Sequence, residues 1–138
     1  RTEEGYTPLH KAAIHGTPAK IKALLAAGAD IMARNESGQT PLHSAGEFGG
    51  TLANIQALIA AGADVMARGG LSSRTPLHVD AGWEGSAACI KALVAAGADV
   101  MDRASNGNTA LHQAVYIVVG TKLRQAVNLL CTWLLLLF

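Results

Sequence analysis

The sequence is poor in cysteine, in aromatic residues and in net charge. Its 138 residues include only two cysteines, Cys89 and Cys131, which form no CxxC pair and no ladder of bridges. A disulfide framework is therefore excluded, and nothing indicates a zinc knuckle. Aromatic residues make up 4% of the chain although half of it is hydrophobic, so alanine and leucine supply the apolar content. That composition favours helices.

Charge and targeting signals are equally sparse. The formal net charge is +1, so we expect no nucleic acid as partner. Residues 1–4 contain no apolar signal segment, and with so few cysteines this predicts a cytoplasmic protein. The apolar residues 131–138 are too short to span a bilayer, because Lys122 and Arg124 interrupt the stretch before them. We therefore expect no membrane span.

Signatures of catalysis are missing as well. The sequence has no glycine-rich phosphate loop after a strand, no HExxH and no GxSxG. We therefore predict that the chain is not an enzyme and that it uses no cofactor and no metal.

What the sequence does contain is a repeat of 33 to 35 residues. TPLH occurs at 7–10, 40–43 and 75–78, and TALH follows at 109–112. A second marker, GAD, recurs at 28–30, 62–64 and 97–99 with the same period. Two independent markers at one period predict an array of stacked structural units.

Each unit contains the signals of two short helices. Thr7 is a good N-cap, and Pro8 suits the first helical position because it needs no amide donor there. Gly16 ends this helix, and the Thr-Pro start signal returns at 17–18. Gly28 then ends the second helix, and a loop leads to the next unit. No single unit can bury its apolar stripe, so the units must stack.

These residues carry a resemblance to a known family. The segments GYTPLHKAAIHG…IKALLAAGADI, GQTPLHSAG…IQALIAAGADV and RTPLHVDAG…IKALVAAGADV each resemble an ankyrin repeat. The resemblance implies one all-α solenoid domain over residues 1–138, with stacked helix-turn-helix units and projecting β-hairpin loops. The expected repeats span approximately 5–37, 38–72, 73–106 and 107–138. It also implies a protein-interaction module that binds another protein in a concave groove and with its loops.

Two parts of the sequence depart from the repeat. The loop 68–74 is one residue longer than its neighbour, and Ser73 takes the place of the usual glycine. The fourth unit lacks GAD and ends in LLLLF. That apolar end allows an alternative in which the chain is a self-associating structural spacer, with contacts through Trp133–Phe138. A third alternative is a regulatory domain of a larger protein.

The recurring histidines His10, His43, His78 and His112 are predicted to be structural. Equivalent residues of stacked repeats lie roughly one helix spacing, about 8–10 Å, apart, so they cannot converge on one metal ion. We expect each imidazole to form a hydrogen bond with the backbone of the adjoining loop.

The groove candidates follow the repeated motif. The eighth residue after the repeat threonine is His15, Phe48 or Trp83 in the first three units, and Tyr116 lies close to this register in the fourth. Large aromatic residues on a rigid surface are typical anchors for binding. The alternative is that the rings fill space left by neighbouring glycines. The predicted groove residues are His15, Glu47, Phe48, Trp83, Glu84 and Tyr116.

The loops supply a second set of candidates, because loops on a rigid scaffold often carry recognition. Each is also compatible with a plain solvated turn. The predicted loop residues are Tyr6, Glu36, Ser37, Gln39, Leu71, Arg74, Asn106 and Asn108.

The turns after GAD contain two further columns. Arg34, Arg68 and Arg103 recur four residues after each aspartate, which suggests either a basic stripe for an acidic partner or a solvated loop face. The methionines at 32, 66 and 101 are expected to pack under the loops as flexible apolar filler. The aspartates themselves should form local bonds within the turn.

Overall fold

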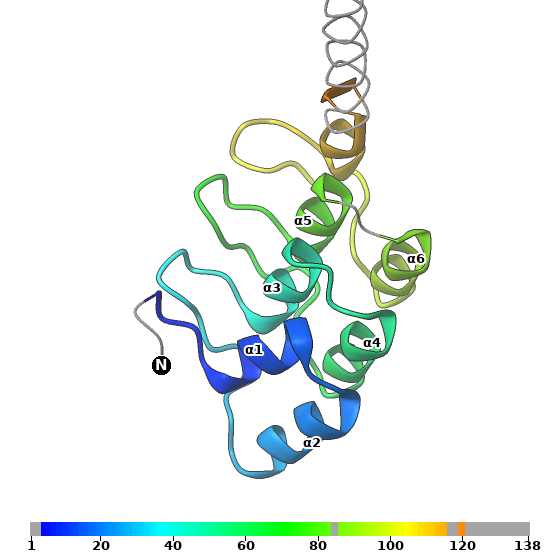
Figure 1. Cartoon of the computed structure of the whole chain (residues 1–138). Helices are drawn as coiled ribbons and strands as arrows, with labels where there is room; N and C mark the ends of the chain where they lie inside the picture. The colour runs from blue at the N-terminus through cyan, green and yellow to red at the C-terminus, as the bar shows by residue number, and fades with distance from the viewer. Residues whose placement is uncertain (1–3, 84–85, 116–118, 121–138) are drawn as a thin grey trace, which may run out of the picture.

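The chain is a stack of helix pairs with long loops on one side. The computed structural model describes residues 4–83, 86–115 and 119–120. The helices are α1 (Pro8–His15), α2 (Pro18–Ala26), α3 (Pro41–Glu47), α4 (Leu52–Ala60), α5 (Pro76–Gly82) and α6 (Ala87–Ala95). Residues 110–115 are also helical and continue the stack above α5 (Figure 1). This confirms the predicted all-α repeat architecture, while the repeat boundaries stay predictions.

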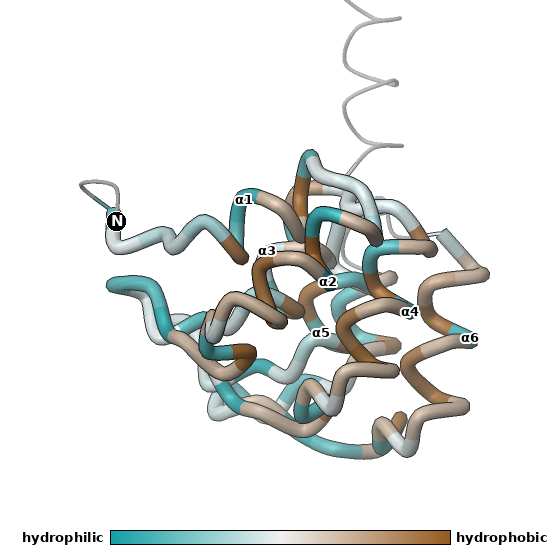
Figure 2. Tube along the Cα trace, turned by 90° about the horizontal axis from the view of Figure 1, so that it is seen from below, coloured by the Kyte–Doolittle hydropathy of each residue, from teal (hydrophilic) through white to brown (hydrophobic). Residues whose placement is uncertain are grey.

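The helices form two layers. The inner layer is α1, α3 and α5, and the outer layer is α2, α4 and α6; consecutive helices of each layer are in contact (Figure 1). Loops extend from the inner layer on the side opposite the outer helices, and their tips are hydrophilic (Figure 2). Leucine and isoleucine side chains fill the space between the layers. The most deeply buried are Leu9, Ile21, Leu42, Ile55, Leu58, Leu77 and Leu93.

Each inner helix begins with the same capping box. In α1, the His10 amide donates to Thr7 Oγ1 at 3.4 Å, and the Thr7 amide donates to His10 Nδ1 at 3.2 Å. Thr40 and Thr75 start α3 and α5 with the same reciprocal arrangement. Two backbone amides that a helix start would otherwise leave without partners are thereby satisfied.

The other nitrogen of each imidazole joins neighbouring units. Because Nδ1 accepts the threonine amide, Nε2 carries the proton and donates. His10 Nε2 lies 3.0 Å from the Gln39 carbonyl oxygen, and His43 Nε2 lies 2.9 Å from that of Arg74. His78 likewise reaches the next loop at 102 and 108. The predicted structural role of these three histidines is confirmed.

Two glycine positions explain the tight turns. Gly28, like its equivalents at 62 and 97, has a positive φ and follows the last residue of an outer helix, where the left-handed conformation is needed. Gly50 lies between α3 and α4 for a different reason. A Cβ there would lie 2.7 Å from the Ala13 carbonyl oxygen and 2.9 Å from the Ala45 Cα, so the turn can approach both helices only as glycine.

The loops are less regular than expected. Within the described residues, the anticipated β-hairpins reduce to one isolated bridge between Gly69 and Arg74. Each loop closes with a few backbone bonds of its own, such as the Asn35 amide to the Gln39 carbonyl oxygen at 3.0 Å. Neighbouring loops are also joined: the Gly70 amide donates to the Ser37 carbonyl oxygen at 2.9 Å, and the Ser105 amide to that of Ser72 at 2.9 Å. No helix among these residues is long and apolar enough to cross a membrane.

Ser73 has a strained backbone conformation in the loop 68–74. Its φ is +50°, whereas the glycines at the equivalent positions 38 and 107 have φ of +75° and +80°. A residue with a Cβ pays about 1–2 kcal/mol in this region. The gain from glycine is partly offset by the greater freedom of the unfolded chain. We expect Ser73→Gly to raise the free energy of unfolding by about 0.5–1 kcal/mol in urea titrations. A lower free energy of unfolding for Ser73→Gly would show that Ser73 is not strained.

The imidazole link gives a second stability prediction. His43→Ala should lower the free energy of unfolding by about 2–3 kcal/mol, because it leaves the buried Thr40 amide without its partner and removes the bond between the two units at the Arg74 carbonyl oxygen. His15→Ala, at an exposed position, is the matched control and should change it by less than about 0.5 kcal/mol. Equal effects of the two substitutions in chemical denaturation would show that the link carries no stability.

Candidate partner-binding groove

A row of aromatic rings crosses three repeats. Tyr6 and Phe48 have ring centroids 6.5 Å apart in an edge-to-face arrangement, and Phe48 and Trp83 have centroids 6.4 Å apart at a tilt of 34°. Phe48 is 48% exposed and Trp83 is 51% exposed. Rings that only filled space beside glycines would be covered. Their half exposure therefore leaves a contiguous aromatic surface in contact with solvent.

Two hollows adjoin this row. One, of about 310 Å³, lies between the loops and the inner helices and is lined by Tyr6, Gln39, Glu47 and Arg74, among others. The other, of about 400 Å³, is bounded by Phe48, Trp83, Glu47 and the glycines at 46 and 49. We use "the groove" for the surface formed by Tyr6, Glu47, Phe48, Arg74 and Trp83.

Glu47 is held by a short chain of amide side chains. Gln39 Nε2 donates to Glu47 Oε2 at 2.6 Å, and Asn35 Nδ2 donates to Gln39 Oε1 at 3.1 Å. Gln39 is only 8% exposed, so this predicted loop residue supports the groove from within. Among the described residues Glu47 has no ion pair. Its charge nevertheless reaches Tyr6, whose phenol pKa is raised first by burial and then by Glu47 and Glu4.

A second carboxylate lies beneath the groove. Asp80 on α5 is 2% exposed, and its Oδ2 has no hydrogen-bond partner. Its Cβ lies 3.2 Å from the place where a Cβ of Gly46 would be, so it is packed behind that glycine, which itself lines the 400 Å³ hollow. Burial raises the pKa of this carboxyl to about 6. The other repeats have alanine at this position: 12, 45 and 114.

The remaining candidates are spread over the surface. His15 is exposed and borders a separate hollow of about 500 Å³ with Tyr6 and two lysines. The ring contacts among the described residues do not include it. The loop candidates Glu36, Ser37, Leu71 and Asn106 are exposed, while Arg74 and Asn108 are half-buried. The predicted residues Glu84, Tyr116 and Trp133–Phe138 lie outside the described residues.

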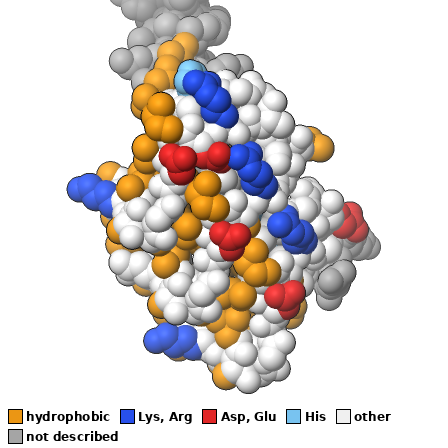
Figure 3. Space-filling view, turned by 180° about the vertical axis from the view of Figure 1, so that it is seen from behind, with side chains coloured by type: hydrophobic (Ala, Val, Ile, Leu, Met, Phe, Trp, Pro, Cys, Tyr) orange, Lys and Arg blue, Asp and Glu red, His pale blue; other side chains and the backbone are white. Residues whose placement is uncertain are grey.

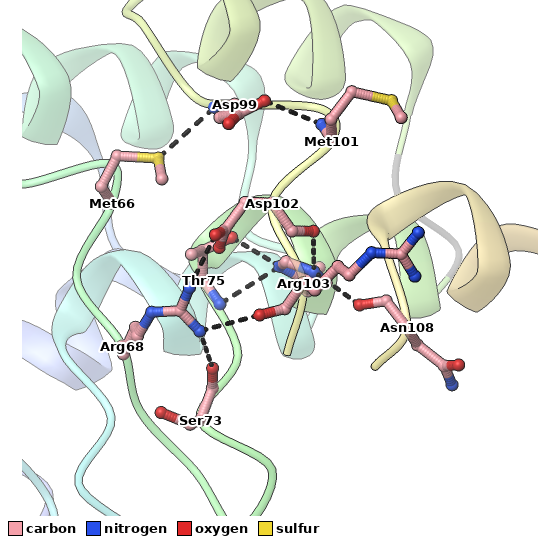
Figure 4. A network of polar contacts seen from close by, with 10 residues as sticks. Met66, Arg68, Ser73, Thr75, Asp99, Met101, Asp102, Arg103 and Asn108 are labelled. Carbon is pink, nitrogen blue, oxygen red and sulfur yellow. Dashed lines mark hydrogen bonds and ion pairs between the residues drawn. The ribbon is translucent and has the colours of Figure 1, made fainter. Parts of the chain in front are cut away.

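The arginine column lies on an exposed face of the loops, as one of the two alternatives predicted, and its guanidinium groups also form hydrogen bonds to loop carbonyls. Arg34 Nη1 donates to the Arg68 carbonyl oxygen at 2.6 Å, and Arg68 Nη1 donates to that of Arg103 at 3.0 Å. Arg68 also forms an ion pair with Asp102 at 2.6 Å (Figure 4). Basic and acidic side chains are interspersed on this side of the molecule (Figure 3). Arg34 and Arg68 therefore link one loop to the next, whereas Arg103 bonds the Gly107 carbonyl oxygen of its own loop at 2.7 Å.

The methionines and aspartates of the same turns behave in part as expected. Met66 N donates to Asp64 Oδ1 at 2.8 Å, and the turns at 30 and 99 repeat this bond. Met66 packs against the core, and its sulfur accepts from the Asp99 amide at 3.4 Å (Figure 4). Met101, in contrast, is exposed, so filling is not the role of every methionine.

Sequence reasoning overlooked several buried polar residues, and two of them shape the site and its scaffold. One is Asp80, which only a comparison of equivalent repeat positions would have exposed. The other is Asn54, whose Nδ2 donates to the carbonyl oxygens at 12, 13 and 16 and thereby satisfies the end of α1. In the described residues no group of three histidine, cysteine or acidic side chains could hold a metal ion.

Comparison with known families gives one match. The family model described as "Ankyrin repeats (3 copies)" matches residues 1–69, which is half of the chain. No curated protein matches the sequence significantly.

The buried carboxyl gives a pH-dependent prediction. Because its folded-state pKa of about 6 lies above the ordinary 3.8, ionisation of Asp80 destabilises the fold progressively as the pH rises from about 4 to 6, and the loss is complete above that. At pH 8, Asp80→Ala should raise the free energy of unfolding by about 1–3 kcal/mol, and the gain should shrink near pH 4. Glu36→Ala, at an exposed carboxylate, is the control. Urea titrations showing Asp80→Ala to be destabilising at pH 8 would refute the prediction.

Proposed function

Because the chain belongs to the ankyrin repeat family, whose repeats are generally protein–protein interaction modules, we propose that its groove binds a segment of a partner protein. Ankyrin repeat domains are typically non-enzymatic, and the proposal needs no chemistry beyond recognition. The partner would lie against the inner helices, with the loops along one edge of the contact. Fold alone does not define the partner, so the proposal depends on the surface that this chain presents.

The contiguous aromatic row is the observation that carries the proposal. Tyrosine, tryptophan and arginine are the residues most enriched among binding hot spots, and the groove combines Tyr6, Trp83 and Arg74. Phe48 joins the tyrosine to the indole across adjacent repeats. An aromatic surface that spans three units and stays half exposed is the kind of apolar patch that marks an interaction site.

The surrounding scaffold makes this surface rigid. α3, which carries Glu47 and leads into Phe48, packs against both α1 and α5. The imidazole links of His10 and His43 connect the same helices to the loops that form the other wall. A preorganised surface loses little conformational entropy on binding, which favours affinity. The exposed loop candidates Glu36, Ser37, Leu71 and Asn106 would then contribute to specificity.

The double variant Phe48→Ala/Trp83→Ala tests the groove. Peptides selected from a random display library against the full chain would serve as the probe, with affinity measured by fluorescence polarisation. Removing two aromatic anchors should weaken binding by at least about thirtyfold, since one hot spot contributes about 2 kcal/mol or more. Both side chains are half exposed, so the variant should keep the helical circular dichroism of the parent.

The matched control removes two exposed hydrophobic side chains elsewhere. Val94 and Met101 lie outside the groove and are 40% and 68% exposed. Val94→Ala/Met101→Ala should leave peptide affinity within about twofold of the parent, because isolated surface apolar groups contribute little to recognition. Peptides that bind the groove variant as tightly as the parent would place the binding surface elsewhere.

A further inference from the structure

The hollow between Phe48 and Trp83 has an unusual set of charges. Of the residues that the structure describes, the two rings, Glu47 and glycines line it, and none of them is a lysine, arginine or histidine. Arg74 lines the adjoining hollow but forms no ion pair with Glu47. The wall behind Gly46 contains Asp80, which is nine-tenths or more buried and has an oxygen without a hydrogen-bond partner. Glu47 therefore borders this hollow without a paired cation among the described residues, and a second carboxyl, that of Asp80, is buried behind Gly46.

The rings of Phe48 and Trp83, like the nearby carboxylates, favour a cationic ligand. The face of an aromatic ring carries negative charge density and attracts a cation placed over it. Phe48 and Trp83 are inclined by only 34° to each other, so both can turn a face toward one inserted group. Tryptophan is the best of the aromatic partners for a cation.

The shape of the site favours arginine over lysine. A guanidinium is planar, stacks on aromatic faces and presents a fork of donors that matches a carboxylate. It is also more weakly hydrated than an ammonium, so it enters a hollow with apolar walls more readily. Glu47 Oε2 is already fixed by Gln39, which holds this carboxylate at the edge of the hollow ready for such a donor.

We propose that this hollow receives an arginine side chain of the partner, stacked against Phe48 and Trp83 and paired with Glu47, with the buried carboxyl of Asp80 adding negative charge behind Gly46. This inference rests on the proposed groove function and specifies the chemistry of its ligand. It also gives Asp80 a role. A buried carboxylate replaces the alanine of the other repeats at a loss of stability, which is a common sign of a functional position.

A direct test uses the arginine side chain alone. N-acetyl-arginine methylamide is titrated at millimolar concentrations into the ¹⁵N-labelled full chain and followed by NMR. It should shift the backbone amide signals of Gly46, Glu47 and Trp83 and the indole N–H signal of Trp83. The citrulline analogue has the same shape without the charge and should leave them in place. Glu47→Gln should weaken the arginine response by about tenfold, the loss expected for one charged hydrogen bond. Asp64→Asn removes the same charge at an exposed turn and is the control.

The selected peptides then separate this inference from the groove function. Arginine-containing peptides should lose about tenfold in affinity on replacement of arginine by citrulline, and Glu47→Gln should cause no additional loss for the citrulline peptide. Peptides that bind the groove, as shown by their loss with Phe48→Ala/Trp83→Ala, but tolerate Glu47→Gln would overturn the arginine site and leave the groove intact. Equal affinity for lysine in place of arginine, or no signal shift with the arginine probe, would overturn it as well.

Discussion

The fold depends on one imidazole placed between a helix start and a neighbouring loop. His43 shows the arrangement in full: Nδ1 accepts the Thr40 amide while Nε2 donates to the Arg74 carbonyl oxygen of the next unit. Burial lowers the pKa of His43, which favours the neutral ring that this pairing requires. One side chain thereby satisfies groups in two units, so the helix cannot be capped without the loop being fixed. The two walls of the groove are placed relative to each other by this bond.

The local elements of the fold were predictable because their causes are local. Threonine caps, proline at the first helical position and glycine after the outer helix each act within a few residues, and the structure has them where the sequence indicated. The bonds of Arg34 and Arg68 to the next loop were not predicted, because the acceptors are backbone carbonyls about 34 residues away along the chain. Nothing in the arginine itself or its neighbours reports that distance. The expected hairpins lack strands among the described residues because each loop closes over only a few residues, with one isolated bridge between Gly69 and Arg74.

The candidate site likewise contains residues that local sequence signals predicted and residues whose role depends on distant contacts. Phe48 and Trp83 were predicted from their register, and the structure brings them into one row with Tyr6, which the sequence had placed among the loops. Gln39 was grouped with exposed loop residues, yet it lies inside and holds Glu47. Asp80 was not predicted because the rest of its repeat, including the TPLH and GAD markers, follows the common pattern. Side-chain environment, rather than position in the motif, decides the role of such residues.

The stack is periodic in its interior and aperiodic on its surface. Every unit reuses threonine, histidine and leucine at the same inner positions, so these residues present identical chemistry at each step. The eighth position after the threonine changes from imidazole at His15 to phenyl at Phe48 and indole at Trp83. A bound chain displaced by one unit would therefore meet a different ring at each point. The translational symmetry that builds the scaffold is broken at the proposed groove, which would set the register in which a ligand binds.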